Sequence, residues 1–204
     1  MMKKTFGIIA LLTAIVSIFT SCNTRNNSLT SDEGVVMNGV RWATRNVDKF
    51  GTFAESPEDA GMLYQWNRRR GWNNTDRAIP IGWDETGAEG TTWYTVNDPC
   101  PTGWRVPTSA ELRSLNSVGS VWATQNGING RLFGIAPNHI FLPSAGFRNF
   151  QGILVDVGTQ GSYWSMTSAV RNAENLWWRL NFGDSSNVGN TMRANASSIR
   201  CVAE

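Results

Sequence analysis

The stretch Asp98-Pro-Cys-Pro-Thr-Gly-Trp-Arg-Val-Pro-Thr-Ser-Ala-Glu-Leu112 decides how this sequence is expected to fold. Its four residues of Pro and Gly before position 108 exclude a regular helix or a central strand, so this part is predicted to be a shaped loop. A helix is then expected to begin, because Thr108 and Glu111 have the Thr-x-x-Glu spacing of a capping box. The loop therefore carries Cys100 directly toward a helix start. The apolar residues that follow on one face of this helix are Leu112, Leu115 and Val118.

Residues 1–21 have the pattern of an export signal. Lys3 and Lys4 precede an apolar run over 6–19, which is short for a membrane span. Small residues then lead into Cys22, an ending that resembles the lipobox of bacterial lipoproteins and implies lipidation of Cys22. The alternative is an ordinary secretory signal or a single signal anchor. We therefore expect an outer-membrane lipoprotein of the cell envelope, facing either the outside or the periplasm, with residues 22–34 as a flexible polar tether.

The cysteines fit an oxidising compartment. Setting Cys22 aside leaves Cys100 and Cys201, an even pair in a chain that is expected to leave the cytosol. We predict that they form a disulfide, and the chain-entropy model gives roughly 4–5 kcal/mol of stabilisation for the long loop that it closes. The alternative is a redox or nucleophilic thiol. It is disfavoured because neither cysteine has a nearby His or a second Cys in Cys-x-x-Cys spacing.

The composition describes one globular domain, expected over 35–204. Hydrophobic residues make up 41% and charged residues 17% of the 204 residues, and the 20 Gly and 10 Trp favour a turn-rich, aromatic-packed core over a helical bundle. Beyond the leader, basic and acidic side chains balance, so no nucleic-acid partner is predicted. Further patterns predict a hairpin at Asn38-Gly39, a helical turn over 56–59, strands over 61–66, 129–133, 139–143 and 198–202, an irregular segment over 71–97 and a hairpin at Gln151-Gly152.

The run Arg68-Arg69-Arg70 is the one concentrated basic segment, and Trp66 and Trp72 flank it. We interpret it as a solvated loop, because three charges in a loop are more often surface than site. Stacking of the arginines on aromatic rings, or binding of an acidic ligand, is the alternative.

The sequence contains four distinctive blocks, Cys100–Leu112, Phe141–Arg148, Gly161–Ser165 and Ile199–Val202. In this order they resemble those of the Fibrobacter succinogenes major paralogous domain. The resemblance runs from about position 39 to 202. This family is similar to the C-type-lectin-like fold and to the formylglycine-generating-enzyme group. It implies an α+β fold with short antiparallel strands, one or two helices and long irregular aromatic-rich loops, while leaving the ligand open.

The sequence offers little for catalysis or metal binding. It lacks a nucleophile elbow, a phosphate-binding loop and an H-E-x-x-H helix, and its one histidine, His139, is expected to be structural. Relatives of the formylglycine-generating type use paired cysteines and copper, whereas the pair here is expected to be a disulfide. Adjacent acids at 58–59 and 84–85 have no fixed separation for a glycosidase pair. The calcium motifs of true C-type lectins are absent, so we predict no cofactor and no metal ligands, and leave a structural calcium ion open.

The last strands are the predicted binding surface. In 176–182, Trp177, Arg179 and Asn181 alternate with an apolar face, and polar connections over 166–175 and 183–196 flank this segment. Two options remain: the face is exposed to a ligand, or a long loop covers it and the strand is buried on both sides. Some bacterial C-type-lectin-like lipoproteins have a hypervariable C-terminal segment, and the layout of 162–196 is similar. The predicted ligand-binding residues are Met166, Arg171, Asn172, Trp177, Arg179, Asn181 and Arg193.

The resulting hypothesis is a lipid-anchored module that binds a glycan or protein ligand without catalysis, as an adhesin does. The alternative is a structural subunit of a pilus tip or envelope assembly. A further alternative is a degenerate enzyme of the formylglycine-generating type.

Overall fold

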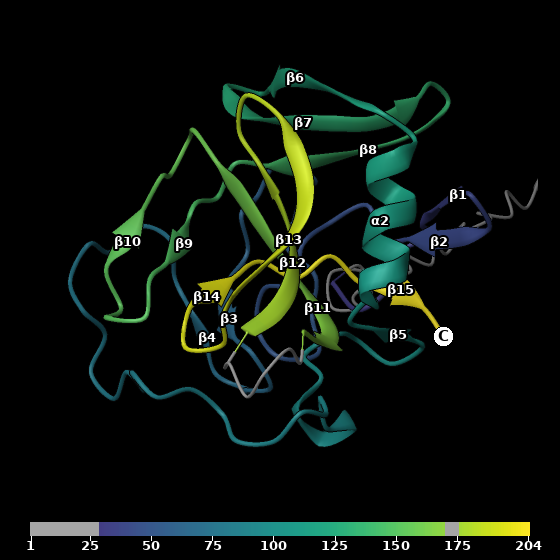
Figure 1. The fold of residues 1–204 in the computed structure, drawn as a ribbon. Coiled ribbons are helices and arrows are strands. Elements are labelled where there is room, and N and C mark those ends of the chain that lie inside the picture. Colours follow the sequence, from purple (N-terminus) through teal and green to yellow (C-terminus); the bar gives the residue numbers. More distant parts are fainter. Residues whose placement is uncertain (1–28, 170–175) are drawn as a thin grey trace, which may run out of the picture.

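The computed structural model describes residues 29–169 and 176–204 (Figure 1). This part of the chain contains one α-helix, one short 3-10 helix and strands in four sheets, so the predicted α+β class with short antiparallel strands is confirmed. The elements are β1 (Val35–Met37), β2 (Val40–Trp42), β3 (Leu63–Gln65), β4 (Gly71–Trp72), η1 (Thr95–Asn97), β5 (Trp104–Arg105), α2 (Ser109–Ser117), β6 (Ser120–Gln125), β7 (Ile128–Ile135), β8 (Asn138–Pro143), β9 (Phe147–Arg148), β10 (Leu154–Val155), β11 (Gly161–Ser168), β12 (Leu176–Phe182), β13 (Ser186–Met192), β14 (Ala196–Ser197) and β15 (Val202–Ala203).

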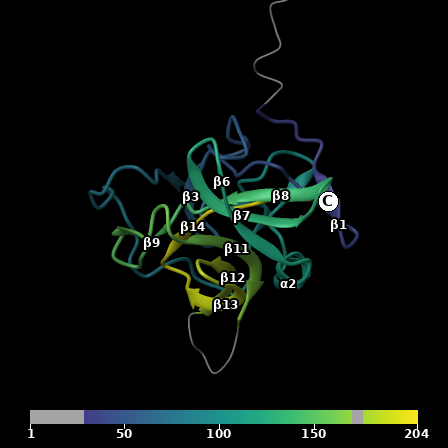
Figure 2. The ribbon, with the colours of Figure 1, turned by 90° about the horizontal axis from the view of Figure 1, so that it is seen from above.

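The four sheets bring distant parts of the chain together. Their strand orders are β1-β2-β15-β5, β10-β9-β14-β3-β4, β11-β12-β13 and β6-β7-β8. The first sheet joins the start of the described chain to its end. The helix α2 lies against the β11-β12-β13 sheet, and the view from above shows β6, β7 and β8 beside that sheet (Figure 2).

The predicted helix start is confirmed. Thr108 accepts a hydrogen bond from the backbone N–H of Glu111, and the Glu111 carboxylate accepts one from the backbone N–H of Thr108 at 2.7 Å. Arg105 donates to both carboxylate oxygens of Glu111, at 2.9 and 2.6 Å. Although burial opposes ionisation of Glu111, the hydrogen bonds from Arg105 and Thr108 hold its pKa below the usual value. One carboxylate thus fastens the shaped loop to the helix.

Two Asn-Gly pairs make tight hairpin turns. Asn38 and Gly39 have φ angles of 48° and 78°, and they connect β1 to β2 as predicted. Asn126 and Gly127, with φ angles of 48° and 80°, connect β6 to β7 in the same way. Positive φ at both central residues is what the two-residue turn of a twisted hairpin requires.

The predicted disulfide is confirmed between Cys100 and Cys201. Around Cys201 the last segment of the chain runs through the interior. The carbonyls of Ile199 and Cys201 accept hydrogen bonds from the backbone N–H groups of Val47 and Ala43, and the Ser198 carbonyl accepts one from Trp164. Of the strand predicted over 198–202, Ser198 forms an isolated bridge with Tyr163, residues 199–201 are buried outside any strand, and Val202 begins β15. The reason is that this backbone bonds with two different neighbours in turn, β11 and the 43–47 segment.

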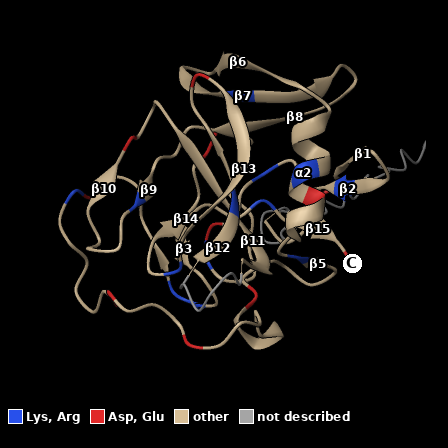
Figure 3. Cartoon of the chain, in the orientation of Figure 1, with Lys and Arg blue, Asp and Glu red and all other residues tan. Residues whose placement is uncertain are grey.

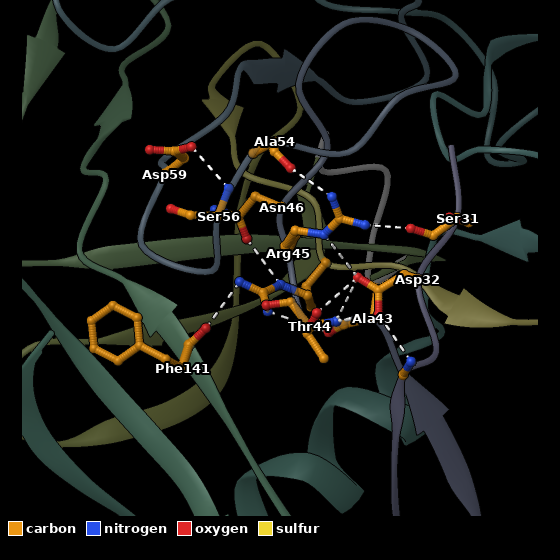
Figure 4. Close-up of polar contacts among 12 residues, drawn as sticks. Ser31, Asp32, Ala43, Thr44, Arg45, Asn46, Ala54, Ser56, Asp59 and Phe141 are labelled. Carbon is orange, nitrogen blue, oxygen red and sulfur yellow. Dashed lines mark hydrogen bonds and ion pairs between the residues drawn. The ribbon is translucent and has the colours of Figure 1, made fainter. Parts of the chain in front are cut away.

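A buried polar network surrounds Arg200, the residue before Cys201. Figure 4 labels four of its partners, Ala43, Thr44, Asn46 and Phe141. The Arg200 guanidinium donates to the Asn46 side chain at 3.0 Å, to the Phe141 carbonyl at 3.0 Å, and to the carbonyls of Ala43 and Thr44. Burial lowers the pKa of Arg200 to about 10. The carbonyls replace the water that a buried cation loses, and so join the 43–46 segment to β8.

Tyr163 of β11 lies in the same interior. Its hydroxyl donates to the Pro143 carbonyl at 2.8 Å and accepts a bond from the Asn46 side chain at 3.3 Å. Burial raises the pKa of Tyr163 from 10.0 to about 12. The neutral phenol is thus the form that the folded chain favours.

Three expectations need correction. Residues 29–34, expected in the tether, contact the domain: the Asp32 carboxylate accepts hydrogen bonds from Thr44 and Arg45 (Figure 4). The Leu29 carbonyl also accepts one from the backbone N–H of Phe53. The expected helical turn over 56–59 is a non-helical turn, in which Asp59 accepts a bond from the Ser56 backbone. The expected connection over 183–196 contains β13, whose seven residues, mostly polar, pair with the seven residues of β12.

We expect that replacing both disulfide cysteines, Cys100→Ser with Cys201→Ser, lowers the free energy of unfolding by about 4–5 kcal/mol, because the unfolded chain regains the freedom of a long loop. Urea titration followed by tryptophan fluorescence measures the difference. Dithiothreitol should bring the wild type to the stability of the variant and leave the variant unchanged. Equal stability of the oxidised wild type and the variant would contradict the expectation.

We expect the wild type to lose stability between pH 10 and about 12, the usual and the raised pKa of Tyr163. A group whose pKa is raised by folding contributes stability below its unfolded pKa and loses that contribution as the pH passes its folded pKa. The Tyr163→Phe variant should therefore show a shallower fall over this interval, although its stability at pH 8 is lower. Urea titrations at several pH values compare the slopes, and identical slopes would refute the role assigned to Tyr163.

Candidate functional site

Of the two options for the predicted binding strand, the structure shows the second, in which a loop covers the face that carries Trp177. Trp177 is 3% exposed, and its ring centroid lies 4.9 Å from that of Trp66. Trp66 in turn packs on Trp93, so the loop that carries Trp93 covers this face of β12. The expectation of an exposed Trp177 is wrong, because the long aromatic-rich loop buries it. The other face of β12 enters the core under α2 through Leu180 and Phe182.

Of the two polar neighbours of Trp177 on β12, Arg179 is held by contacts within the domain. Arg179 donates to the Ser162 hydroxyl at 2.7 Å, and its guanidinium lies 4.9 Å from the centre of the Phe147 ring. Burial lowers the pKa of Arg179 to about 10. Asn181 is partly buried, and its side-chain oxygen has no hydrogen-bond partner among the described residues.

The remaining predicted ligand-binding residues do not form one surface. Met166 packs against the core around the disulfide, and its backbone N–H donates to the Pro107 carbonyl at 2.7 Å. Arg193 covers the Trp177 ring at 5.0 Å. Arg171 and Asn172, like the proposed lipid anchor Cys22, lie outside the described residues. Trp177 and Arg193 are therefore brought together, but as packing partners.

A cleft of about 410 Å³ lies elsewhere, between the β6-β7-β8 sheet and two turns. Trp122 of β6 lines one wall and is 42% exposed. Asn129 of β7, the 158–159 turn and the 183–184 turn line the rest. We call this the Trp122 cleft; its lining residues are Trp122, Asn129, Gly158, Thr159, Gly183 and Asp184.

Arg131 fixes the walls of the Trp122 cleft. It pairs with Trp122 across the sheet and is 9% exposed. Its guanidinium donates to the carbonyls of Gly183 and Asp184, at 2.9 and 3.1 Å, and to the Ser120 hydroxyl at 3.0 Å. One buried cation thereby holds the β12–β13 turn against β6, so the two walls keep a set separation.

Asn129 fixes the third wall. Its side-chain nitrogen donates to the Gly158 carbonyl at 3.1 Å, and its side-chain oxygen accepts from the Thr124 hydroxyl at 2.9 Å. The Asp184 carboxylate makes no side-chain hydrogen bond among the residues that the structure describes, and it is exposed at the rim. The cleft thus presents an aromatic ring beside a carboxylate that can accept hydrogen bonds.

The Trp122 cleft was not predicted, although the sequence contains one signal for it. Asn126-Gly127 is the same hairpin signal as Asn38-Gly39, and it would have predicted β6 and β7 as a hairpin that carries Trp122. The 183–184 turn lines the cleft because Arg131 holds it there. No local sequence pattern predicts such a tertiary contact.

The described residues contain no group of three or more His, Cys, Asp or Glu side chains placed to hold a metal ion. Among them, no helix is long and apolar enough to cross a membrane. Comparison with protein-family models, with curated proteins and with solved structures found no match to this chain.

Proposed function

We propose that this protein is a lipid-anchored, non-catalytic module of the cell envelope that binds a glycan in the Trp122 cleft, on a fold of the C-type-lectin-like type. The fold proposal rests on the sequence blocks that resemble the Fibrobacter succinogenes major paralogous domain. Two features of the structure are compatible with it: the long irregular segment over 73–94 and the disulfide that ties the loop before α2 to the last strands.

The exposed Trp122 ring is the observation that carries the proposed function. A sugar ring has an apolar face of C–H groups and a rim of hydroxyls, so an aromatic platform beside hydrogen-bonding groups suits it. The volume of about 410 Å³ is within the range of small-molecule sites. Because Arg131 and Asn129 already hold the walls, binding needs little ordering of the cleft.

The structural-subunit alternative is favoured by a different feature, the outer edge of β6. In the described chain, β6 pairs only with β7, and its six residues contain no charged side chain. Edge strands of monomeric proteins are usually protected by charges, bulges or a covering segment, whereas an open edge accepts a strand from a partner. Self-association or strand capture, measured by sedimentation velocity, is the property that this alternative requires.

We expect Trp122→Ala to weaken glycan binding at least about tenfold, because removal of a central aromatic residue commonly has an effect of this size. The full chain in detergent is first tested on a glycan array, and the strongest glycan is then titrated by calorimetry. Tyr94→Ala, which removes an aromatic residue that is 53% exposed outside the cleft, is the matched control and should bind like the wild type. An EDTA arm tests for a structural calcium ion.

Two results would count against glycan binding in the Trp122 cleft. One is that the folded wild type binds no glycan of the array. The other is binding that Trp122→Ala leaves unchanged while its cooperative unfolding shows that it is folded. If the wild type binds no glycan, self-association or strand capture would favour the structural-subunit alternative.

A further inference from the structure

The turn between β3 and β4 carries Arg68, Arg69 and Arg70, and all three are exposed (Figure 3, blue beside β3). They line an open cavity of about 390 Å³, together with Asp84 and Asn97 from the long segment that follows. This cavity is separate from the Trp122 cleft, since the two share no lining residue. We call it the arginine cavity.

Aromatic rings hold two of the three arginines in place. The Arg69 guanidinium lies 4.1 Å from the centre of the Phe50 ring, and the Arg70 guanidinium lies 4.0 Å from the centre of the Trp72 ring. Stacking uses the flat face of a guanidinium and leaves its N–H groups at the edge free to donate. Both cations are therefore partly ordered before a ligand arrives.

The charge of the arginine cavity is positive after its one acid is counted. Arg68 donates to Asp84 at 2.6 Å, and Asp84 also accepts bonds from Thr86 and Gly87. The hydrogen bond from the Thr86 side chain, followed by the Thr86 backbone and Arg68, lowers the pKa of Asp84 to about 2, although burial opposes this. Asp84 is thus ionised at neutral pH and offsets one arginine, which leaves Arg69 and Arg70 without a carboxylate hydrogen bond among the described residues.

We infer that the arginine cavity is an anion site, independent of the proposed glycan cleft, that binds a sulfate or carboxylate group of an acidic polysaccharide. Guanidinium groups bind such oxyanions through paired N–H donors. An acidic peptide fits less well, because the sheet edge beside the cavity, β4, has only two residues for backbone pairing. A general attraction of the whole protein for polyanions is not expected, since the charges of residues 22–204 balance.

The test measures binding of the full chain in detergent to a sulfated dextran oligosaccharide, with neutral dextran of the same length as reference. We expect binding of the sulfated chain only, weakened by added salt, and a loss of at least about tenfold in Arg69→Gln/Arg70→Gln, which removes two charge-assisted contacts. Arg41→Gln/Arg113→Gln is the matched control. It removes two exposed arginines elsewhere, of which Arg113 stacks on Trp178 at 4.2 Å, and it should bind within about twofold of the wild type.

Asp84→Asn tests the same site through an expected increase in affinity for the sulfated chain. The amide keeps one oxygen for the turn but removes the charge that offsets Arg68, so we expect about threefold tighter binding of the sulfated chain. Equal losses in the two double variants, equal binding of neutral dextran, or weaker binding by folded Asp84→Asn would overturn the inference. Preference for a polyglutamate chain of equal charge would also overturn it, in favour of an acidic protein partner. Trp122→Ala should not affect this binding, so failure here is distinguishable from failure of the glycan proposal.

Discussion

The rest of the structure depends on how the buried guanidinium of Arg200 is satisfied. A charge removed from water is costly unless hydrogen bonds replace the lost solvation, and the Arg200 guanidinium donates to the side-chain oxygen of Asn46 and to backbone carbonyls. Those carbonyls come from the segment after β2 and from β8, so these segments must approach Arg200 together. The neighbouring Cys201 is bonded to Cys100 at the same place. A charge and a covalent bond therefore fix where the last segment of the chain runs.

That fixed segment explains why β12 is buried on both faces. Residues 198–201 lie between the 43–47 segment and β11. The sheet that contains β11 and β12 therefore has a hydrophobic cluster on each face, one with Trp177 and the other with Leu180 and Phe182. Trp177 then faces the core that also holds the disulfide, where Trp66 and the long loop cover it. A large aromatic residue placed there gains more by packing against other rings than it would by contact with water. Trp122, which is 42% exposed, belongs to a different sheet, on its edge strand β6.

Turns, caps and the disulfide were predictable from the sequence, whereas the burial of a strand face by a distant loop was not. The Thr108–Glu111 capping box, the Asn38-Gly39 turn and the cysteine pair each rest on residue types that permit few alternatives, and the structure contains all three. The alternation in 176–182 correctly separated two faces of β12. It could not show that a loop from 88–93 would cover one of them, because burial of a face depends on segments about ninety residues away. The strand β13 was missed for a related reason: its polar residues pair with β12 without an apolar pattern of their own.

The two proposed ligand sites share a physical design in which a cation orders the surface before binding. In the Trp122 cleft the cation is buried, and Arg131 donates its N–H groups to the carbonyls of the 183–184 turn. It therefore shapes the wall, and Trp122 and Asp184 are the residues left to contact a ligand. In the arginine cavity the cations are exposed and rest on rings, so their N–H groups stay available. The same side chain therefore serves as scaffold where carbonyls surround it and as a binding group where only aromatic faces do. This difference follows from burial, and it separates a site suited to a neutral sugar ring from one suited to an anion.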